Sequence, residues 1–301
     1  MTGHNQSVSP AQNFPDLRGE LACFGLPPTL HQLNCLLSTA PVDLKNFRNA
    51  IQGNPDLVVE TLKLCNSSLF NLSQPLSSLE QAVMVTGADI VRTLLLTCWL
   101  IKHAASKLPA HVNQLFWGHC LLVAKMSRRI SEWLGLAQPE QAFLAGLLHD
   151  VGLLVLLSRF SRDSATEDVF KDLGEAIGPQ RRRFGIDHCE LGRQLGTALG
   201  FPLHFVDVFT KHHQCGISFS NPLVAIVGAA EQISRGWCPR EHCPLPPAES
   251  RQLIREAFQK YLPSLSQPSS LHLVESLEAD LLGDITPRAA GAWNIWGEDS
   301  F

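Results

Sequence analysis

A histidine and an aspartate stand side by side, as His149-Asp150, in an otherwise apolar stretch that reads AFLAGLLHDVGLLVLL over residues 142–157. The stretch is typical of a core helix, because a membrane span needs about 20 residues. An unpaired charge inside such a helix would cost several kcal/mol of folding free energy. The pair therefore needs partners, which are either a metal ion or polar side chains from elsewhere in the chain.

Other apolar segments of the second half also carry isolated polar residues of the same chemical types. They are His119, His188, the adjacent pair His212-His213, and Glu231. Imidazole and carboxylate groups together suit iron, manganese or another divalent metal ion such as zinc. Neighbouring residues of a helix point about 100° apart, so His149 and Asp150 face one ion only if the helix is locally distorted. Otherwise one residue binds the ion while the other bridges a second ion or orients a ligand.

Interpretations without a metal remain open for each of these residues. His149 and Asp150 would also suit a satisfied polar pair that fixes helix packing. The later histidines would suit helix caps or surface positions, and Glu231 would then pair with a nearby arginine or histidine.

Helical spacing of apolar residues predicts the elements that hold these side chains. In the second half, the predicted helices cover residues 112–136, 142–157, 181–199, 203–213 and 222–234. Shorter helices are predicted over residues 29–37, 43–52, 55–66, 81–86 and 90–103, with a turn at Asn66-Ser67 and with Ser77 and Glu80 at capping-box spacing. No stretch alternates between apolar and polar residues as a half-buried strand does. The sequence therefore predicts an all-α protein.

The composition excludes several classes of protein. The 301 residues are 45% hydrophobic and 7% aromatic, with a net charge of -4 and a pI near 6.3. Such a chain is not expected to bind nucleic acid, and its basic run, residues 181–183, is expected at a solvated helix end. The nine scattered cysteines are typical of buried thiols in a reducing cytosol. No secretory signal or membrane span is visible, so the chain is predicted to be cytoplasmic.

Several motifs resemble one family of helical proteins. The stretch FLAGLLHDVG, with WGHC some thirty residues before it, resembles the HD superfamily of metal-dependent phosphohydrolases. The segments NPDLVVETLKLCNSSLF, SSLEQAVMVTGADIVRTLLL, IDHCELGRQLGTALGFP and KHHQ are similar to the HDOD domain. This domain is a bacterial signalling relative of the HD and HD-GYP phosphodiesterases. The resemblance covers roughly residues 17 to 235.

The resemblance implies a multi-helix HDOD fold and a regulatory role, since HDOD domains generally lack demonstrated catalytic activity. It places Glu231 where HD families have a late aspartate ligand. It also places six residues at the metal-ligand positions of the HD-GYP centre: His119, His149, Asp150, His188, His212 and His213. Two departures count against hydrolysis of cyclic di-GMP. Leu153 stands where HD-GYP proteins have a lysine that can contact phosphate, and the chain lacks a GYP motif after the paired histidines.

The resemblance also suggests how the chain is divided. We expect a flexible tail over residues 1–16, an HDOD domain over 17–235 and a C-terminal helical extension over 236–301. Within the domain, a small N-terminal helical bundle (17–111) would pack on a degenerate HD-type bundle (112–235).

The expected function is that of a non-enzymatic signalling module. It would bind other signalling proteins and would keep a vestigial metal or ligand site. The alternative is a metal-dependent phosphohydrolase or phosphodiesterase that acts on a nucleotide or phosphoester.

Overall fold

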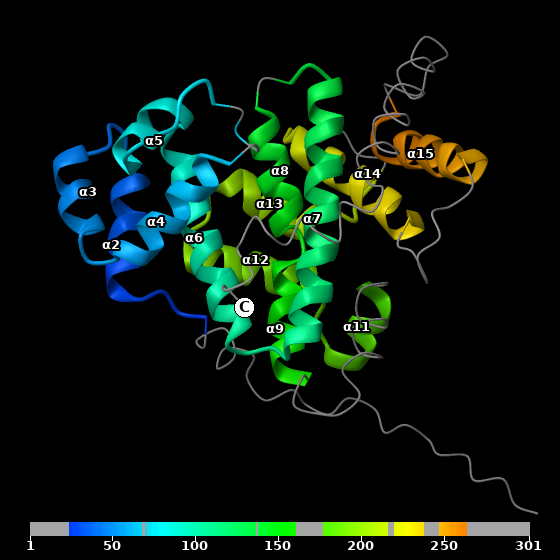
Figure 1. Ribbon diagram of the computed structural model, residues 1–301. Coiled ribbons are helices and arrows are strands. Elements are labelled where there is room, and N and C mark those ends of the chain that lie inside the picture. The colour runs from blue at the N-terminus through cyan, green and yellow to red at the C-terminus, as the bar shows by residue number, and fades with distance from the viewer. Residues whose placement is uncertain are drawn as a thin grey trace, which may run out of the picture.

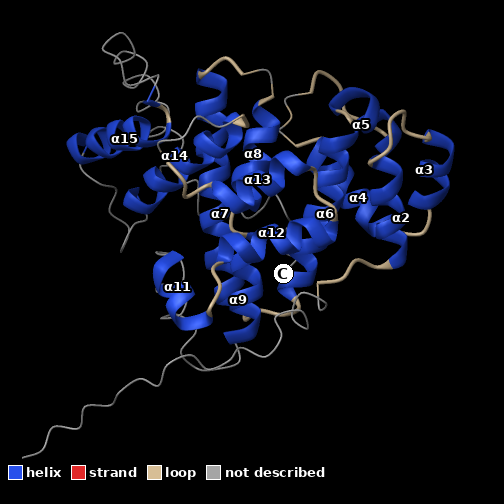
Figure 2. Cartoon of the chain, turned by 180° about the vertical axis from the view of Figure 1, so that it is seen from behind, coloured by secondary structure: helices blue, strands red, loops and turns tan. Residues whose placement is uncertain are grey.

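The computed structural model describes residues 24–67, 70, 72–136, 138–160, 177–215, 220–237 and 247–263. Every regular element within these ranges is an α-helix, and no strand occurs there (Figures 1 and 2). The predicted all-α class is therefore confirmed. The expected tail, residues 1–16, and the end of the expected extension, residues 264–301, lie outside the described residues.

Helices α2 to α6 form the amino-terminal bundle, coloured blue to cyan in Figure 1. Its apolar side chains at helical spacing, such as Leu30, Leu33 and Leu37, are buried. Its helices are α2 (Pro28–Leu37), α3 (Leu44–Ile51), α4 (Pro55–Cys65), α5 (Leu79–Thr86) and α6 (Ala88–Ala105).

Ser78 is the N-cap of α5, and the side chain of Gln81 bonds back to the residue before it. The Ser78 hydroxyl accepts a hydrogen bond from the backbone N–H of Gln81 at 3.2 Å, and Gln81 Oε1 accepts one from the N–H of Ser77 at 2.8 Å. The predicted box of Ser77 and Glu80 is therefore wrong by one residue. Glu80 instead forms an ion pair with Arg48 of α3 at 2.7 Å.

Helices α7 to α14 form the second bundle. The prediction of a single helix over residues 181–199 is wrong, because two helices, α11 and α12, share these residues. Gly185, with a φ of +73°, follows the end of one helix, and Asp187 caps the next by accepting from the N–H of Glu190 at 2.9 Å. The helices are α7 (Ala110–Trp133), α8 (Pro139–Leu148), α9 (Val151–Phe160), α11 (Ile177–Phe184), α12 (His188–Leu199), α13 (Leu203–Lys211) and α14 (Pro222–Trp237).

The central apolar stretch is interrupted at the residues of chemical interest. His149 and Asp150 form a turn between the end of α8 and the start of α9. The single helix predicted over residues 142–157 is therefore wrong, and the local distortion that lets both side chains face one place is present. Within the described residues, only the stretch Pro139–Ser158, which runs from α8 through the turn into α9, has the length and composition of a membrane span. Because 89% of its apolar window is buried inside the protein, the stretch belongs to the core.

The two bundles share one continuous core of buried apolar side chains. A polar junction also joins them. Asn34 of α2 donates to the carbonyl of Leu199 at 2.9 Å and accepts from Arg92 Nε at 2.6 Å. Arg92 also donates to the carbonyl of Gly200. The junction thus attaches the C-terminal end of α12 to the amino-terminal bundle.

A further helix, α15 (Pro247–Tyr261), packs on α14 (Figure 1). The Tyr261 ring lies against Gly228, where a Cβ atom would come within 2.4 Å of the ring and 2.6 Å of the carbonyl oxygen of His212. The absence of a side chain at Gly228 therefore lets α14, α15 and the end of α13 approach closely.

Candidate metal centre

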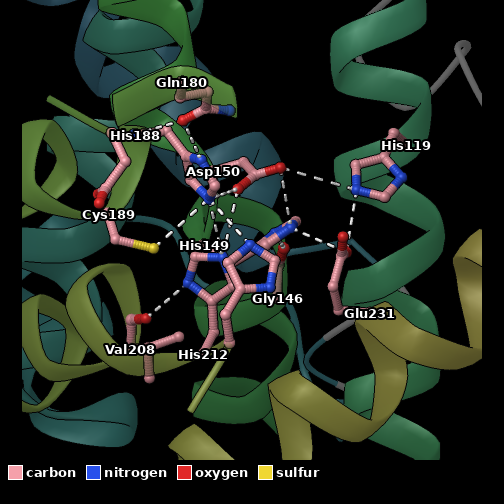
Figure 3. Close-up of polar contacts among 12 residues, drawn as sticks. His119, Gly146, His149, Asp150, Gln180, His188, Cys189, Val208, His212 and Glu231 are labelled. Carbon is pink, nitrogen blue, oxygen red and sulfur yellow. Dashed lines mark hydrogen bonds and ion pairs between the residues drawn. The ribbon is translucent and has the colours of Figure 1, made fainter. Parts of the chain in front are cut away.

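The seven predicted ligand residues lie together inside the second bundle (Figure 3). They come from five segments that are far apart in the sequence, so only the tertiary fold brings them together. His119 lies on α7, His149 and Asp150 between α8 and α9, His188 at the start of α12, His212 and His213 after α13, and Glu231 on α14. Their role as metal ligands remains a prediction.

The first donor group consists of His119, His149, Asp150 and Glu231. Glu231 Oε2 lies 3.0 Å from both His119 Nε2 and His149 Nε2. Asp150 Oδ2 lies 3.3 Å from His149 Nε2 and 3.8 Å from His119 Nε2. Neighbouring ligands of an octahedral ion with bonds of about 2.1 Å lie roughly 3 Å apart. The spacing therefore suits one divalent ion.

The other oxygen of Asp150 faces the second donor group, which consists of His188, Cys189, His212 and His213. Asp150 Oδ1 lies 3.3 Å from His188 Nε2 and 3.4 Å from His212 Nε2. His188 Nε2 also lies 3.4 Å from His212 Nε2 and 2.9 Å from His213 Nε2. Asp150 therefore stands between the two groups with one oxygen directed toward each. The sequence pattern had not indicated Cys189 as a member.

Hydrogen bonds on the far side of the rings orient two of these histidines. His149 Nδ1 lies 2.8 Å from the carbonyl oxygen of Gly146, and His212 Nδ1 lies 2.9 Å from that of Val208. A carbonyl oxygen only accepts, so Nδ1 is the protonated nitrogen that donates. The Nε2 atom of each ring is then directed into the centre, and in the neutral ring its lone pair is placed as a metal ligand requires.

Two residues that the sequence analysis missed support the ligands from behind. Gln180 Oε1 accepts from the backbone N–H and from Nδ1 of His188, both at 2.8 Å. Arg235 donates to Glu231 Oε1, which leaves Oε2 facing the histidines. Glu231 thus contacts an arginine and two histidines, which is the pairing given as the alternative to metal ligation. The four-residue spacing of Glu231 and Arg235 could have revealed that pair, whereas the sequence has no signal for Gln180.

Three buried atoms of the centre make no hydrogen bond: His149 Nε2, Asp150 Oδ1 and Glu231 Oε2. Their side chains are 0%, 4% and 2% exposed, respectively. These atoms face one another and the neighbouring imidazoles: Glu231 Oε2 lies 3.0 Å from His149 Nε2, and Asp150 Oδ1 lies 3.3 Å from His188 Nε2. The buried carboxylate oxygens therefore call for positive charge, which a proton on an imidazole or a cation supplies. A divalent ion fits this requirement, because carboxylate oxygens and imidazole lone pairs are its common ligands.

The electrostatics of the centre keep both carboxylates ionised. Burial alone would favour the neutral acids, but nearby imidazoles outweigh it and hold the pKa values of Asp150 and Glu231 well below their usual range. Burial also disfavours a charged His149, yet the two carboxylates raise its pKa to about 10. Burial, with repulsion from His149 and His212, lowers the pKa of His188 to about 4. A proton on His149 thus offsets the carboxylates, and metal binding would release it.

The position of the HD-GYP lysine lies in the apolar core of this protein. Leu153 on α9 is 2% exposed and belongs to the continuous core. A leucine there supplies no positive charge for a substrate phosphate. The geometry therefore agrees with the sequence departure at this position.

Comparisons with known proteins agree with this architecture. A family model described as the HDOD domain matches residues 25–215. The crystal structure of an HDOD domain protein with unknown function from Geobacter sulfurreducens is similar, with a TM-score of 0.61 at 22% identity, and the match covers 93% of this chain and 99% of that one.

Two structures from Shewanella amazonensis SB2B are also similar. One is proposed to be a phosphohydrolase, with a TM-score of 0.59 at 20% identity, and the other a metal-dependent phosphohydrolase, with 0.53 at 15%. Each match covers 88% of this chain and 97% of the other. At these identities the solved structures show a shared fold alone. No curated protein matches the sequence significantly.

Proposed function

This chain belongs to the HDOD domain family, and we propose that it is a metal-binding regulatory module that acts by contact with other signalling proteins. The enclosure of the donor groups is the observation that supports this function most. A catalytic metal keeps a coordination position open to substrate and water. Here the side chains of five of the seven predicted ligands are at most 4% exposed: His149, Asp150, His188, His212 and Glu231.

The residues of the two donor groups would hold the ions, and Asp150 would contribute to both. A divalent ion supplies positive charge that offsets the buried Asp150 and Glu231 carboxylates. Gln180 and Arg235 keep the ligands oriented from outside the donor groups. The protein's own contribution is therefore a buried set of donors, in which hydrogen bonds orient the rings of His149, His188 and His212.

Metal binding would regulate the protein through the helices that carry the ligands. The donors belong to α7, α12, α14, the turn before α9 and the segment after α13, so an ion ties these segments to one another. When the ion is lost, these contacts weaken and the surface offered to a signalling partner changes. Regulation here means a shift between an ordered, metal-bound surface and a looser, metal-free surface.

Metal analysis of the purified protein tests this proposal directly. We expect stoichiometric iron, manganese or zinc, and a rise in unfolding free energy of roughly 3 kcal/mol when metal-free protein receives an ion at about 100 times its dissociation constant. The variant His149→Ala should lose this rise. The matched control is His204→Ala, because His204 is a half-buried histidine of the same bundle that belongs to neither donor group. The proposal would be contradicted if the unfolding free energy of the metal-free protein did not change on addition of any divalent ion.

A second function, metal-dependent phosphoester hydrolysis, is favoured by one observation. Asp150 directs one oxygen toward each donor group, as expected of a carboxylate that bridges two ions. When bound, such ions polarise a phosphoryl group and lower the pKa of a bound water. Substrate would have to approach beside His119, whose side chain is 21% exposed.

An activity assay separates the two functions. Metal-loaded protein is incubated with bis(4-nitrophenyl) phosphate and with common nucleotides, alongside the Asp150→Asn variant. We expect no release of product above that variant. Turnover that depends on both the metal and Asp150 would instead establish the hydrolase.

A further inference from the structure

The second donor group contains a thiol. Cys189 directly follows His188 at the start of α12 and is 5% exposed. Its Sγ atom lies 3.5 Å from His188 Nε2, and Figure 3 shows the sulfur directed toward the histidines. The donor atoms of Cys189, His212 and His213 also lie within 4.8 Å of one another. The thiol therefore shares one small, buried volume with three imidazoles.

Two of the spacings among these donors match those around a tetrahedral ion, while the 2.9 Å between His188 Nε2 and His213 Nε2 is shorter. Bonds of about 2.0–2.1 Å to nitrogen and 2.3 Å to sulfur place neighbouring ligands roughly 3.3 to 3.6 Å apart. The distance from His188 Nε2 is 3.4 Å to His212 Nε2 and 3.5 Å to Cys189 Sγ. In addition, the buried oxygen Asp150 Oδ1 faces this group and has no hydrogen bond. Its negative charge favours a cation at this position.

We propose that the second donor group is a thiolate site for a zinc-type ion and differs in metal preference from the first donor group. The inference rests on the proposed metal binding and adds the identity of a ligand and the class of ion. Sulfur and imidazole donors favour zinc, cobalt or ferrous iron, whereas the two carboxylates and two imidazoles of the first group also suit manganese. On binding, Cys189 loses its thiol proton to solvent and forms a bond from sulfur to the divalent ion.

Cys120 provides an internal contrast. It also follows a histidine of the centre, His119, and it is fully buried on α7. However, Cys120 belongs to neither donor group. Burial next to a ligand histidine therefore does not by itself place a thiol among the ligands, and Cys120 is a matched control for Cys189.

Cobalt(II) is a suitable probe, because it replaces zinc and its bond to a thiolate gives a charge-transfer band in the near ultraviolet. Metal-free full-length protein is titrated with cobalt(II) and followed by absorption and metal content. We expect the band in the wild type and in Cys120→Ala. In Cys189→Ala the band should disappear, while cobalt still binds to the first donor group. Zinc added to the wild type should displace the cobalt that gives the band before the remaining cobalt.

The outcomes separate this inference from the proposed function. Cobalt that binds stoichiometrically without a thiolate band, or a band retained in Cys189→Ala, overturns the thiolate site and leaves metal binding intact. Protein that binds no cobalt overturns both. X-ray absorption at the zinc edge of the wild-type protein gives the same test without a variant, in case Cys189→Ala fails to fold. With one equivalent of zinc bound, one sulfur neighbour per zinc supports the proposal, and a zinc shell of only nitrogen and oxygen contradicts it.

Discussion

The amino-terminal bundle and the second bundle bury polar side chains in different ways. In the first, threonine hydroxyls bond to carbonyls of their own helix: Thr61 to Leu57, Thr93 to Asp89 and Thr97 to Thr93, each at 2.7 Å. In the second, charged and imidazole side chains from five segments meet at one point. The first arrangement is local, whereas the second depends on the whole bundle.

The two bundles differ in whether their buried polar atoms lie close together, more than in how many of these atoms lack a hydrogen bond. The amino-terminal bundle also contains a buried side-chain nitrogen without a hydrogen bond, that of Asn54. In the second bundle three such atoms, from His149, Asp150 and Glu231, lie in the centre that the two donor groups form. Isolated unsatisfied atoms only reduce stability, whereas convergent donor atoms could hold a cation. The two bundles should therefore respond differently to metal and to mutation.

The largest effect is expected from Asp150→Asn, which removes the carboxylate shared by both donor groups. Metal affinity should fall at least ~100-fold at both positions. Even the mutation of a residue that only supports a ligand lowers metal affinity 10–100-fold. The metal-free protein should lose about 3 kcal/mol or more of unfolding free energy, because His149 loses a buried partner. Metal content and denaturant unfolding measure both effects. The control Thr93→Val in the amino-terminal bundle should retain full metal content. Equal metal loss in both variants would show that the two bundles do not differ in their response to mutation.

How much of this could be read from the sequence differs between local and long-range features. The Asn66 turn was predicted and is confirmed: its side chain donates to the carbonyl of Leu76 at 2.8 Å and accepts from the N–H of Leu76 at 2.6 Å. The break at Gly185 was missed, although a glycine followed by the capping residue Asp187 is a readable signal. The break at His149 is different. Residues on both sides of it are buried, so the apolar pattern continues unchanged through the turn.

For the centre, isolated histidines and acids in apolar segments, together with the family resemblance, predicted which imidazoles and carboxylates lie together. Cys189 could not be recognised in the same way, since a cysteine in an apolar helix is most often a small buried hydrophobe. Gln180 lies on a different helix from His188, and only the turn between α11 and α12 brings them together. Supporting contacts of this kind depend on loop geometry, which hydrophobic periodicity does not encode.

The pH dependence of the metal-free protein sharpens the comparison. The pKa of His188 is lowered to about 4 in the folded protein, mainly by burial, against an ordinary value near 6.5. The unfolded chain therefore binds this proton first. The contribution of His188 to stability is complete above pH 6.5 and is lost as the pH falls toward 4.

Urea unfolding at a series of pH values measures this slope. The variant His188→Gln should flatten the loss between pH 6.5 and 4. The corresponding change in the amino-terminal bundle, His31→Gln, affects an exposed residue of α2 and should leave the slope as in the wild type. Equal slopes in all three proteins would show that the buried imidazole does not control acid stability.

The junction between the bundles should give a smaller effect. Gly200 has a φ of +73°, and a Cβ there would lie 2.4 Å from Asn34 Nδ2. Gly200→Ala should therefore cost about 2–3 kcal/mol, from backbone strain plus a disrupted hydrogen bond. Gly135→Ala is the matched control, since Gly135 has a φ of +65° with no atom within 4 Å of its Cβ position. It should cost about 1–2 kcal/mol. Urea unfolding measures the difference, and identical costs would mean that Asn34 moves aside freely.

The smallest effect is expected from Ser78→Ala, which removes the cap of α5 in the amino-terminal bundle. The backbone N–H of Gln81 loses its acceptor, and the loss of such a cap costs about 1 kcal/mol. The variant Ser78→Asp keeps an acceptor at the same position and should restore the stability. Because the cap serves only its own helix, thermal unfolding should shift while metal content stays at the wild-type level. A loss of bound metal in Ser78→Ala would show that the local arrangement of the first bundle is coupled to the convergent centre of the second.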